Sequence, residues 1–143
     1  MFRWVIRRYK RRSQRRKPKW ERTLFALHKE KARALVLSLI AQENLLYQFQ
    51  IKKVAIRNQS TRWGSCSKQG NLNFNFKIIF LPEHLARYIV IHELCHLKEF
   101  NHGSDFWKLV SLACPNYALE RKELHQISPV LQKGVGPLSN KIK

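Results

Sequence analysis

Hydrophobic positions recur with two different periods along this chain, and these periods predict where its helices and strands lie. Between Trp20 and Tyr47 apolar residues return every three or four positions, with frequent alanines and no proline or glycine, which predicts one long helix. Ile51–Arg57 holds β-branched residues in loose alternation and predicts a short strand. Asn71–Phe80 alternates cleanly between apolar and polar residues, which predicts a half-buried strand along its whole length.

Helices are predicted again in the second half of the chain. Pro82 suits the first turn of a helix that continues from Glu83 to about Phe100. Asn101 is the residue expected to turn the chain at the end of that helix, because asparagine tolerates a left-handed backbone. Two shorter helices follow, over Asp105–Ala113 and Tyr117–Ile127.

This order of elements predicts the α+β class, with the long helix first, strands next and helices last. The turn Lys68-Gln69-Gly70 before the clean strand predicts a hairpin, so we expect a small antiparallel sheet. We expect three parts: a basic N-terminal arm over residues 1–19, one folded domain over residues 20–128, and a loose C-terminal tail over residues 129–143.

Positive charge is concentrated in the N-terminal arm. The 143 residues include 28 Lys or Arg and 9 Asp or Glu, for a net charge of +19, and residues 1–22 hold 11 of the basic residues with Glu21 as their one acid. Trp4 and Tyr9 stand among these arginines, a combination that suits stacking on bases and neutralising phosphates. Nucleic acid is therefore one partner that the arm suits, and a solvated tail is the alternative interpretation.

Hydropathy and cysteine usage bear on the compartment. No apolar run approaches the roughly 18 residues that a membrane span needs, and the N-terminus lacks the pattern of a secretory signal. The three cysteines, Cys66, Cys95 and Cys114, form no CxxC pair, which indicates free thiols in a reducing compartment. We expect a cytoplasmic monomer that does not bind membranes.

The chemistry is concentrated in the segment His92-Glu93-Leu94-Cys95-His96 of the predicted helix. Two histidines four positions apart lie one helical turn apart, at about 6 Å, so both imidazoles can reach one ion. Glu93 lies about 100° around the helix, near enough to contact a water on the metal without binding the metal itself. Zinc would lower the pKa of that water towards about 7, the carboxylate would take its proton, and the hydroxide would attack a carbonyl carbon.

A third metal ligand is expected at His102, which follows His96 by six residues. Three histidines and one water make the open site of a catalytic zinc ion, whereas a structural site is closed. The alternative is a surface helix whose histidines pair with neighbouring side chains. The histidine spacing equals that of metzincins, but Glu99 stands where metzincins have glycine, and Met1 is the only methionine available for a Met-turn.

Aromatic residues and hydrogen-bond donors elsewhere in the chain are also candidates for this site. Trp63 could form a wall of the cleft or anchor its own loop, and Phe106 and Trp107 are expected to pack behind the metal helix. The sequence does not identify the substrate-binding residues, and it leaves four candidates open for the donor that stabilises an oxyanion. These candidates are Tyr117, Tyr88, His84 and Arg62.

From about His28 to Leu124 the chain resembles the YgjP-like metallopeptidases, relatives of the SprT-like and WLM zinc proteases. The matching segments are Arg57–Ser67 (RNQSTRWGSCS), Gly70–Phe76 (GNLNFNF), Leu81-Pro82, Tyr88–His102 (YIVIHELCHLKEFNH), Phe106-Trp107 and the pattern Pro115…Tyr117…Arg121. The resemblance implies a zincin-like mini-domain that hydrolyses peptide bonds, with zinc on His92, His96 and His102 and with Glu93 as the general base. The alternative function is a basic nucleic-acid-associated protein whose zinc site is vestigial or structural.

Overall fold

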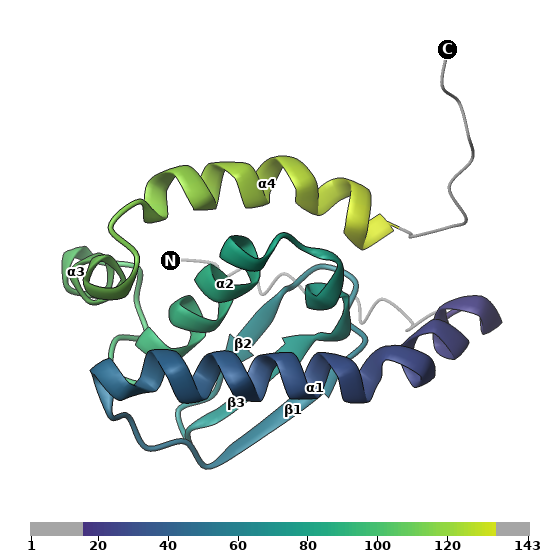
Figure 1. Ribbon diagram of the computed structural model, residues 1–143, viewed down its shortest axis with the longest axis horizontal. Helices are drawn as coiled ribbons and strands as arrows, with labels where there is room; N and C mark the ends of the chain where they lie inside the picture. The colour runs from purple at the N-terminus through teal and green to yellow at the C-terminus, as the bar shows by residue number, and fades with distance from the viewer. Residues whose placement is uncertain (1–15, 134–143) are drawn as a thin grey trace, which may run out of the picture.

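Two helices cover one face of a small sheet, and two further helices complete the molecule (Figure 1). The computed structural model describes residues 16–133. Its elements are, in chain order, α1 (Lys19–Tyr47), β1 (Lys53–Arg57), β2 (Gly64–Cys66), β3 (Asn71–Asn75), the 3-10 helix η1 (Phe76–Phe80), α2 (Glu83–Cys95), α3 (Ser104–Ala113) and α4 (Tyr117–Lys133). The predicted α+β class is confirmed, and so is the long N-terminal helix.

The sheet has the order β1-β3-β2 and is mixed. β2 and β3 pair antiparallel across the predicted hairpin turn, where Gly70 adopts a φ of 84° that favours glycine. β1 and β3 pair parallel, with Val54 opposite Leu72 and Ile56 opposite Phe74. The expectation of an antiparallel sheet is therefore wrong for this pair. The chain crosses from β1 to the far side of the sheet to form β2, and β3 then returns between them in the same direction as β1.

β3 ends at Asn75, so the prediction of a strand as far as Phe80 is wrong. The Asn75 side chain accepts a hydrogen bond from the backbone N–H of Lys77 at 3.2 Å and thereby caps η1. Phe76, Lys77 and Ile78 are consecutive and all buried, which a strand with one solvent-facing side would not allow. The apolar residues after Asn75 are therefore buried around a short helix and do not form one face of a strand.

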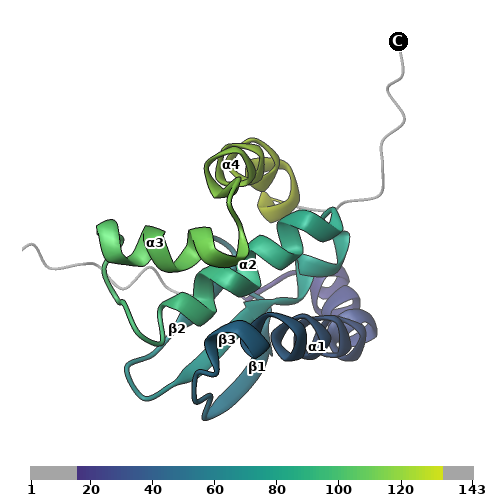
Figure 2. The ribbon, with the colours of Figure 1, turned by 60° about the vertical axis from the view of Figure 1, so that its left-hand side comes forward.

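α1 and α2 pack against each other and against the same face of the sheet, α1 over β1 and α2 over β2. α1 buries a stripe with helical spacing that includes Ala32, Val36, Leu39 and Ile40, whereas Leu27 is exposed. α4 packs against α2 on the side away from the sheet, as both views of the ribbon show (Figures 1 and 2). α2 is thus the central element, in contact with the sheet and with three helices.

The end of α2 differs from the prediction. α2 ends at Cys95 and not near Phe100, because the N–H groups of Leu97 and Lys98 bond to carbonyls three residues back and tighten the chain into a turn. Asn101 does not supply a left-handed turn there, since Gln48 is the only non-glycine residue with positive φ in residues 16–133.

α4 continues to Lys133 with Pro129 inside it, so the helix enters the stretch expected to be a loose tail. Residues 1–15 of the predicted arm and residues 134–143 of the tail lie outside the described residues. Within the described part of the chain, every helix is too short or too polar to cross a membrane.

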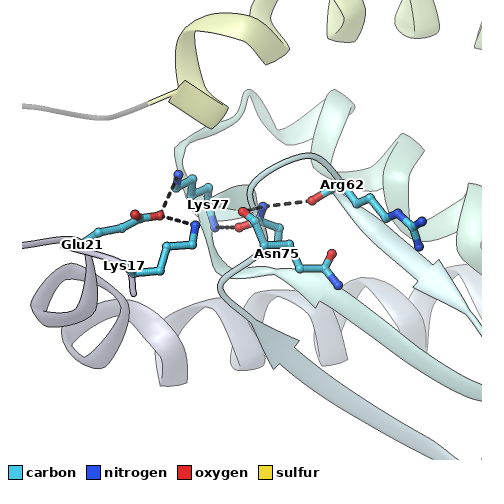
Figure 3. Close-up of polar contacts among 6 residues, drawn as sticks. Lys17, Glu21, Arg62, Asn75 and Lys77 are labelled. Atoms are coloured by element: carbon cyan, nitrogen blue, oxygen red, sulfur yellow. Dashed lines mark hydrogen bonds and ion pairs between the residues drawn. The ribbon is translucent and has the colours of Figure 1, made fainter. Parts of the chain in front are cut away.

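A buried ion pair fastens the first turn of α1 to η1 (Figure 3). Glu21 accepts hydrogen bonding from the Lys17 ammonium at 2.8 Å, and its Oε1 lies 3.4 Å from Nζ of Lys77. Lys77 is only 1% exposed, so removing its carboxylate partner would weaken the compensation of a buried charge. The pair therefore fixes where the long helix meets the end of β3.

We expect Asn75→Ala to lower the free energy of unfolding by about 2–4 kcal/mol, measured by urea denaturation. The fully buried Asn75 amide donates to the carbonyl oxygens of Gln59 at 3.0 Å and Arg62 at 2.9 Å, and both acceptors would lose their partner. Asn73→Ala is the matched control, because Asn73 lies on the half-exposed outer face of the same strand. Equal losses in the two variants would contradict this account.

Candidate metal centre

Three histidine side chains converge at the end of α2. His92 lies in the last turn of α2, His96 caps the helix, and His102 stands in the segment that leads into α3. Their three Nε2 atoms form a triangle with 3.1 Å between each pair. Nitrogen ligands at about 2.0–2.1 Å from one tetrahedral ion lie about 3.3–3.4 Å apart, so the triangle is close to the size that a metal ion requires. The structure thus brings the three predicted ligands together.

The protonation of the rings also suits a cation. Nδ1–H of His96 donates to the carbonyl oxygen of Glu99 at 2.9 Å, and since a carbonyl can only accept, the Nε2 atom is left with a free lone pair. Burial lowers the pKa of His96, and burial together with the other two histidines and Arg121 lowers that of His92 to about 3. The rings of His92 and His96 are therefore neutral near pH 7, as metal ligands must be.

The first residues of α3 pack behind the three rings, as predicted. The fully buried Phe106 ring lies 4.5 Å from the His96 ring and 4.9 Å from each of the other two. Nε1–H of Trp107 donates to the carbonyl oxygen of His102 at 3.2 Å and fixes the segment that carries the third ligand. The early end of α2 and these aromatic contacts together hold His102 against the helix.

Glu93 projects from α2 onto the sheet beside the histidines. It is 7% exposed, and burial raises its pKa to about 8, although Arg62 partly opposes the shift. In β2, Gly64 shares the inward-facing row with Phe74 of β3. A Cβ atom on Gly64 would lie 2.8 Å from Oε1 of Glu93 and 2.7 Å from its Cγ, so the missing side chain makes the space that the carboxylate occupies.

A cleft of about 1290 Å³ opens beside these groups. It is bounded by residues 60–64, by α2 and by α4, and both His92 and Glu93 line it. Trp63 also lines it and donates from Nε1 to Oγ of Ser128 at 2.7 Å, so this residue both forms a wall and anchors its loop to α4. The Glu93 carboxylate and one of the three histidines therefore share one open cavity.

The comparisons with known proteins agree with this arrangement. The family model of the YgjP-like metallopeptidase domain matches residues 5–127, which includes much of the basic arm. The chain belongs to the YgjP-like metallopeptidase family. A search of curated proteins finds no match.

Two solved structures resemble this metallopeptidase. The zymogen of the metallopeptidase abylysin from Pyrococcus abyssi is 29% identical with a TM-score of 0.58, and the match covers 68% of this chain and 95% of that one. The zymogen of jannalysin from Methanocaldococcus jannaschii is 23% identical with a TM-score of 0.52, covers 69% and 96% of the two chains, and bears on the fold alone.

The four candidates for the oxyanion donor are separated by the structure of the metallopeptidase. Tyr88 and Arg62 line the cleft, and burial raises the pKa of Tyr88 to about 12, so its hydroxyl remains a donor. Tyr117 stacks on Trp107 with 4.9 Å between ring centroids. His84 does not line the cleft, and its exposed ring lies 2.8 Å from Glu123.

Sequence reasoning gave no role to two residues of the cleft. In the sequence Gly64 belongs to a turn-rich segment, and its contact with Glu93 becomes apparent only once β2 is placed against α2. Arg121 lies more than twenty positions after the HExxH segment, and the only signal for it was its place in the pattern that resembles the family.

We expect Gly64→Ala to destabilise the protein by about 1–3 kcal/mol, because the new methyl group must displace the Glu93 carboxylate. Urea denaturation measures the loss. Gly103→Ala is the control, since nothing lies within 4 Å of a Cβ atom there, and it should shift stability by no more than about 0.5 kcal/mol. A neutral Gly64→Ala variant would show that Glu93 is free to move.

A second expectation follows from the pKa of Glu93 in metal-free protein. Because that pKa rises from 4.5 in the unfolded chain to about 8, the folded state holds an extra proton in this window, and stability falls as the pH rises through it. Glu93→Gln removes this loss and should gain at least about 1 kcal/mol over the native chain at pH 8, with little gain at pH 4.5. Urea denaturation with a chelator present measures both, and the exposed Glu83→Gln variant should show no such trend.

Proposed function

We propose that this metallopeptidase is a zinc enzyme that hydrolyses peptide bonds by attack of a water molecule. In this proposal His92, His96 and His102 bind the zinc ion and Glu93 is the general base. The observation that carries it is the convergence of three Nε2 atoms, 3.1 Å apart, at the edge of a cleft that is lined by His92 and by the buried carboxylate of Glu93. Such a set leaves a further coordination position for water or substrate.

The donors present favour zinc. Imidazole nitrogens suit zinc among the divalent ions, and three of them are the protein ligands of one known type of catalytic zinc site. When bound, zinc supplies a Lewis acid that lowers the pKa of water towards about 7 and polarises the carbonyl oxygen of the substrate.

Glu93 then moves the protons. Its carboxylate takes a proton from the attacking water and delivers it to the nitrogen of the leaving amine. Burial, which raises its pKa to about 8 in the metal-free protein, makes it a stronger base than an exposed glutamate. Arg62 favours the ionised form that must be present at the start of the reaction. Tyr88, at the same cleft, offers a hydroxyl group that can hydrogen-bond the substrate.

The alternative, a nucleic-acid-associated protein with a vestigial or structural zinc site, depends on the basic arm. Most of that arm lies outside the described residues, and a structural site would have no use for the buried carboxylate of Glu93. We retain the division into an arm over residues 1–19, a domain over residues 20–128 and a tail over residues 129–143 as part of the proposal. A monomer in the cytoplasm also remains an expectation, and the three free cysteines suit a reducing compartment.

Two variants test the proposal by separating metal binding from hydrolysis. We expect His102→Ala to lose the bound zinc, because two histidines remain where three converge. We expect Glu93→Gln to keep about one zinc per chain and to lose about 10²–10⁴-fold in the rate of hydrolysis of fluorescein-labelled casein. Atomic absorption measures the zinc after dialysis, and fluorescence measures the cleavage.

The control is His84→Ala, which changes an exposed histidine on the same helix as His92 and should leave the zinc content unaltered. Hydrolysis that survives in Glu93→Gln would contradict the role of the base. Zinc that remains in His102→Ala would contradict the ligand set.

A further inference from the structure

The cleft beside His92 and Glu93 is lined by cationic side chains from two sides. Arg62 comes from the segment before β2, and Arg121 and Lys122 come from α4. All three are exposed, and Glu93 is the only acidic residue that lines the same cleft. A substrate that enters between these elements therefore passes positive charge on both walls.

The position of Arg62 is fixed by the protein interior. Asn75 is fully buried, and its side-chain amide donates to the carbonyl oxygen of Arg62 at 2.9 Å. The next carbonyl, that of Trp63, accepts from the backbone N–H of Asn75 at 2.7 Å. Figure 3 shows the bond between the Asn75 amide and the Arg62 carbonyl, and the Arg62 side chain extends away from the pair of Glu21 and Lys77. The guanidinium is thus presented from a rigid base.

Arg121 is held beside the histidines by aromatic stacking. Its guanidinium carbon lies 5.1 Å from the ring centroid of Trp107, in the geometry of a cation–π contact. Trp107 itself stacks on His102 at 5.9 Å with 29° between the rings.

Within residues 16–133 these cations form no ion pair, although the charge of Arg62 acts on Glu93 in the same cleft. None of the ion pairs among the described residues involves Arg62, Arg121 or Lys122. The two acidic residues of α4 are engaged elsewhere, since Glu123 binds His84 at 2.8 Å and Glu120 accepts from the thiol of Cys114 at 2.8 Å. The positive charge in the cleft is therefore available to a ligand.

We propose that this cleft selects peptides that carry a carboxylate close to the bond to be cleaved, and that Arg62 and Arg121 are the residues that bind it. The carboxylate is that of an Asp or Glu side chain or of the C-terminus of the substrate, and both present the same two oxygens to a guanidinium group. Basic peptides are disfavoured by the same charges. This inference rests on the proposed function, because it concerns the specificity of the same site.

A peptide fits these observations better than a nucleic acid does. Arg62 and Arg121 line the same cleft as His92 and the buried carboxylate of Glu93, so they act close to where a scissile bond would be. A phosphate backbone is instead bound by rows of cations that neutralise several phosphates at once. Competition by single-stranded DNA is therefore an outcome against the proposal.

The test compares fluorogenic peptides of one length that differ at a single position, with Glu, Gln or Lys next to the cleaved bond. A second pair of peptides ends in a free carboxylate or an amide, which separates the two sources of the charge. With the zinc-loaded full chain we expect kcat/KM for at least one carboxylate peptide to exceed its neutral counterpart by about tenfold or more, mainly through KM. Arg121→Gln should reduce that ratio to below about threefold and leave the neutral peptide within about twofold. Arg62→Gln should also reduce the ratio to below about threefold, and the ratio is its readout because Arg62 also favours the ionised form of Glu93 and its loss can slow every peptide.

Arg57→Gln is the matched control, because it removes one guanidinium from the outer side of β1 and should preserve the preference. Binding gives a second measurement that needs no turnover: fluorescence anisotropy with the zinc-loaded Glu93→Gln variant should show the same order of affinities, weaker at high salt. If the native enzyme hydrolyses no peptide, the proposed function fails. The peptide affinities measured by anisotropy then still show whether the cleft prefers a carboxylate.

Three results would overturn the inference. The first is equal cleavage and binding of the charged and neutral peptides. The second is an equal fall in kcat for every peptide in Arg121→Gln, which would assign that side chain to the transition state and not to selection. The third is displacement of labelled peptides by single-stranded DNA with no discrimination among the peptides.

Discussion

A metal ion can bind three imidazole nitrogens that lie 3.1 Å from one another only if all three are unprotonated. A proton on any Nε2 atom would place a donor or a charge inside the triangle, so neutrality and position must be fixed together. The Glu99 carbonyl fixes the tautomer of His96, burial removes the charge of His92, and Phe106 packs against all three rings. The end of α2 is the structural condition for each of these, because a helix that continued past His96 would carry His102 away.

The carboxylate of Glu93 depends on the sheet in a similar way. Its neighbour in β2 is a glycine, and the antiparallel register with β3 places that glycine on the inner face. The same β3 ends in Asn75, whose buried amide holds the segment before β2. One short strand therefore positions the general-base candidate from one side and the cleft wall that carries Arg62 from another.

Local patterns in the sequence predicted the long helix, the metal helix, the three histidines and the packing of Phe106. Each of these features shows in the spacing of residues that are close together in the sequence. The end of β3 was not predictable, since a buried asparagine that caps a 3-10 helix looks like one more polar residue in an alternating strand. The parallel pairing of β1 and the place of Gly64 depend on strand order, which neighbouring residues do not encode. Arg121 reaches the site only because α4 folds back over α2, a long-range contact that no short motif contains.

The hydrogen bond between Trp63 and Ser128 joins the two walls of the cleft, which lie 65 positions apart in the chain. This bond and the packing of α4 on α2 together set the distance between those walls. An extended chain can reach the histidines only at the width that this contact permits, or after it breaks. Access to the site and chemistry at the site are consequently separate properties, one belonging to the C-terminal part of the fold and the other to its centre.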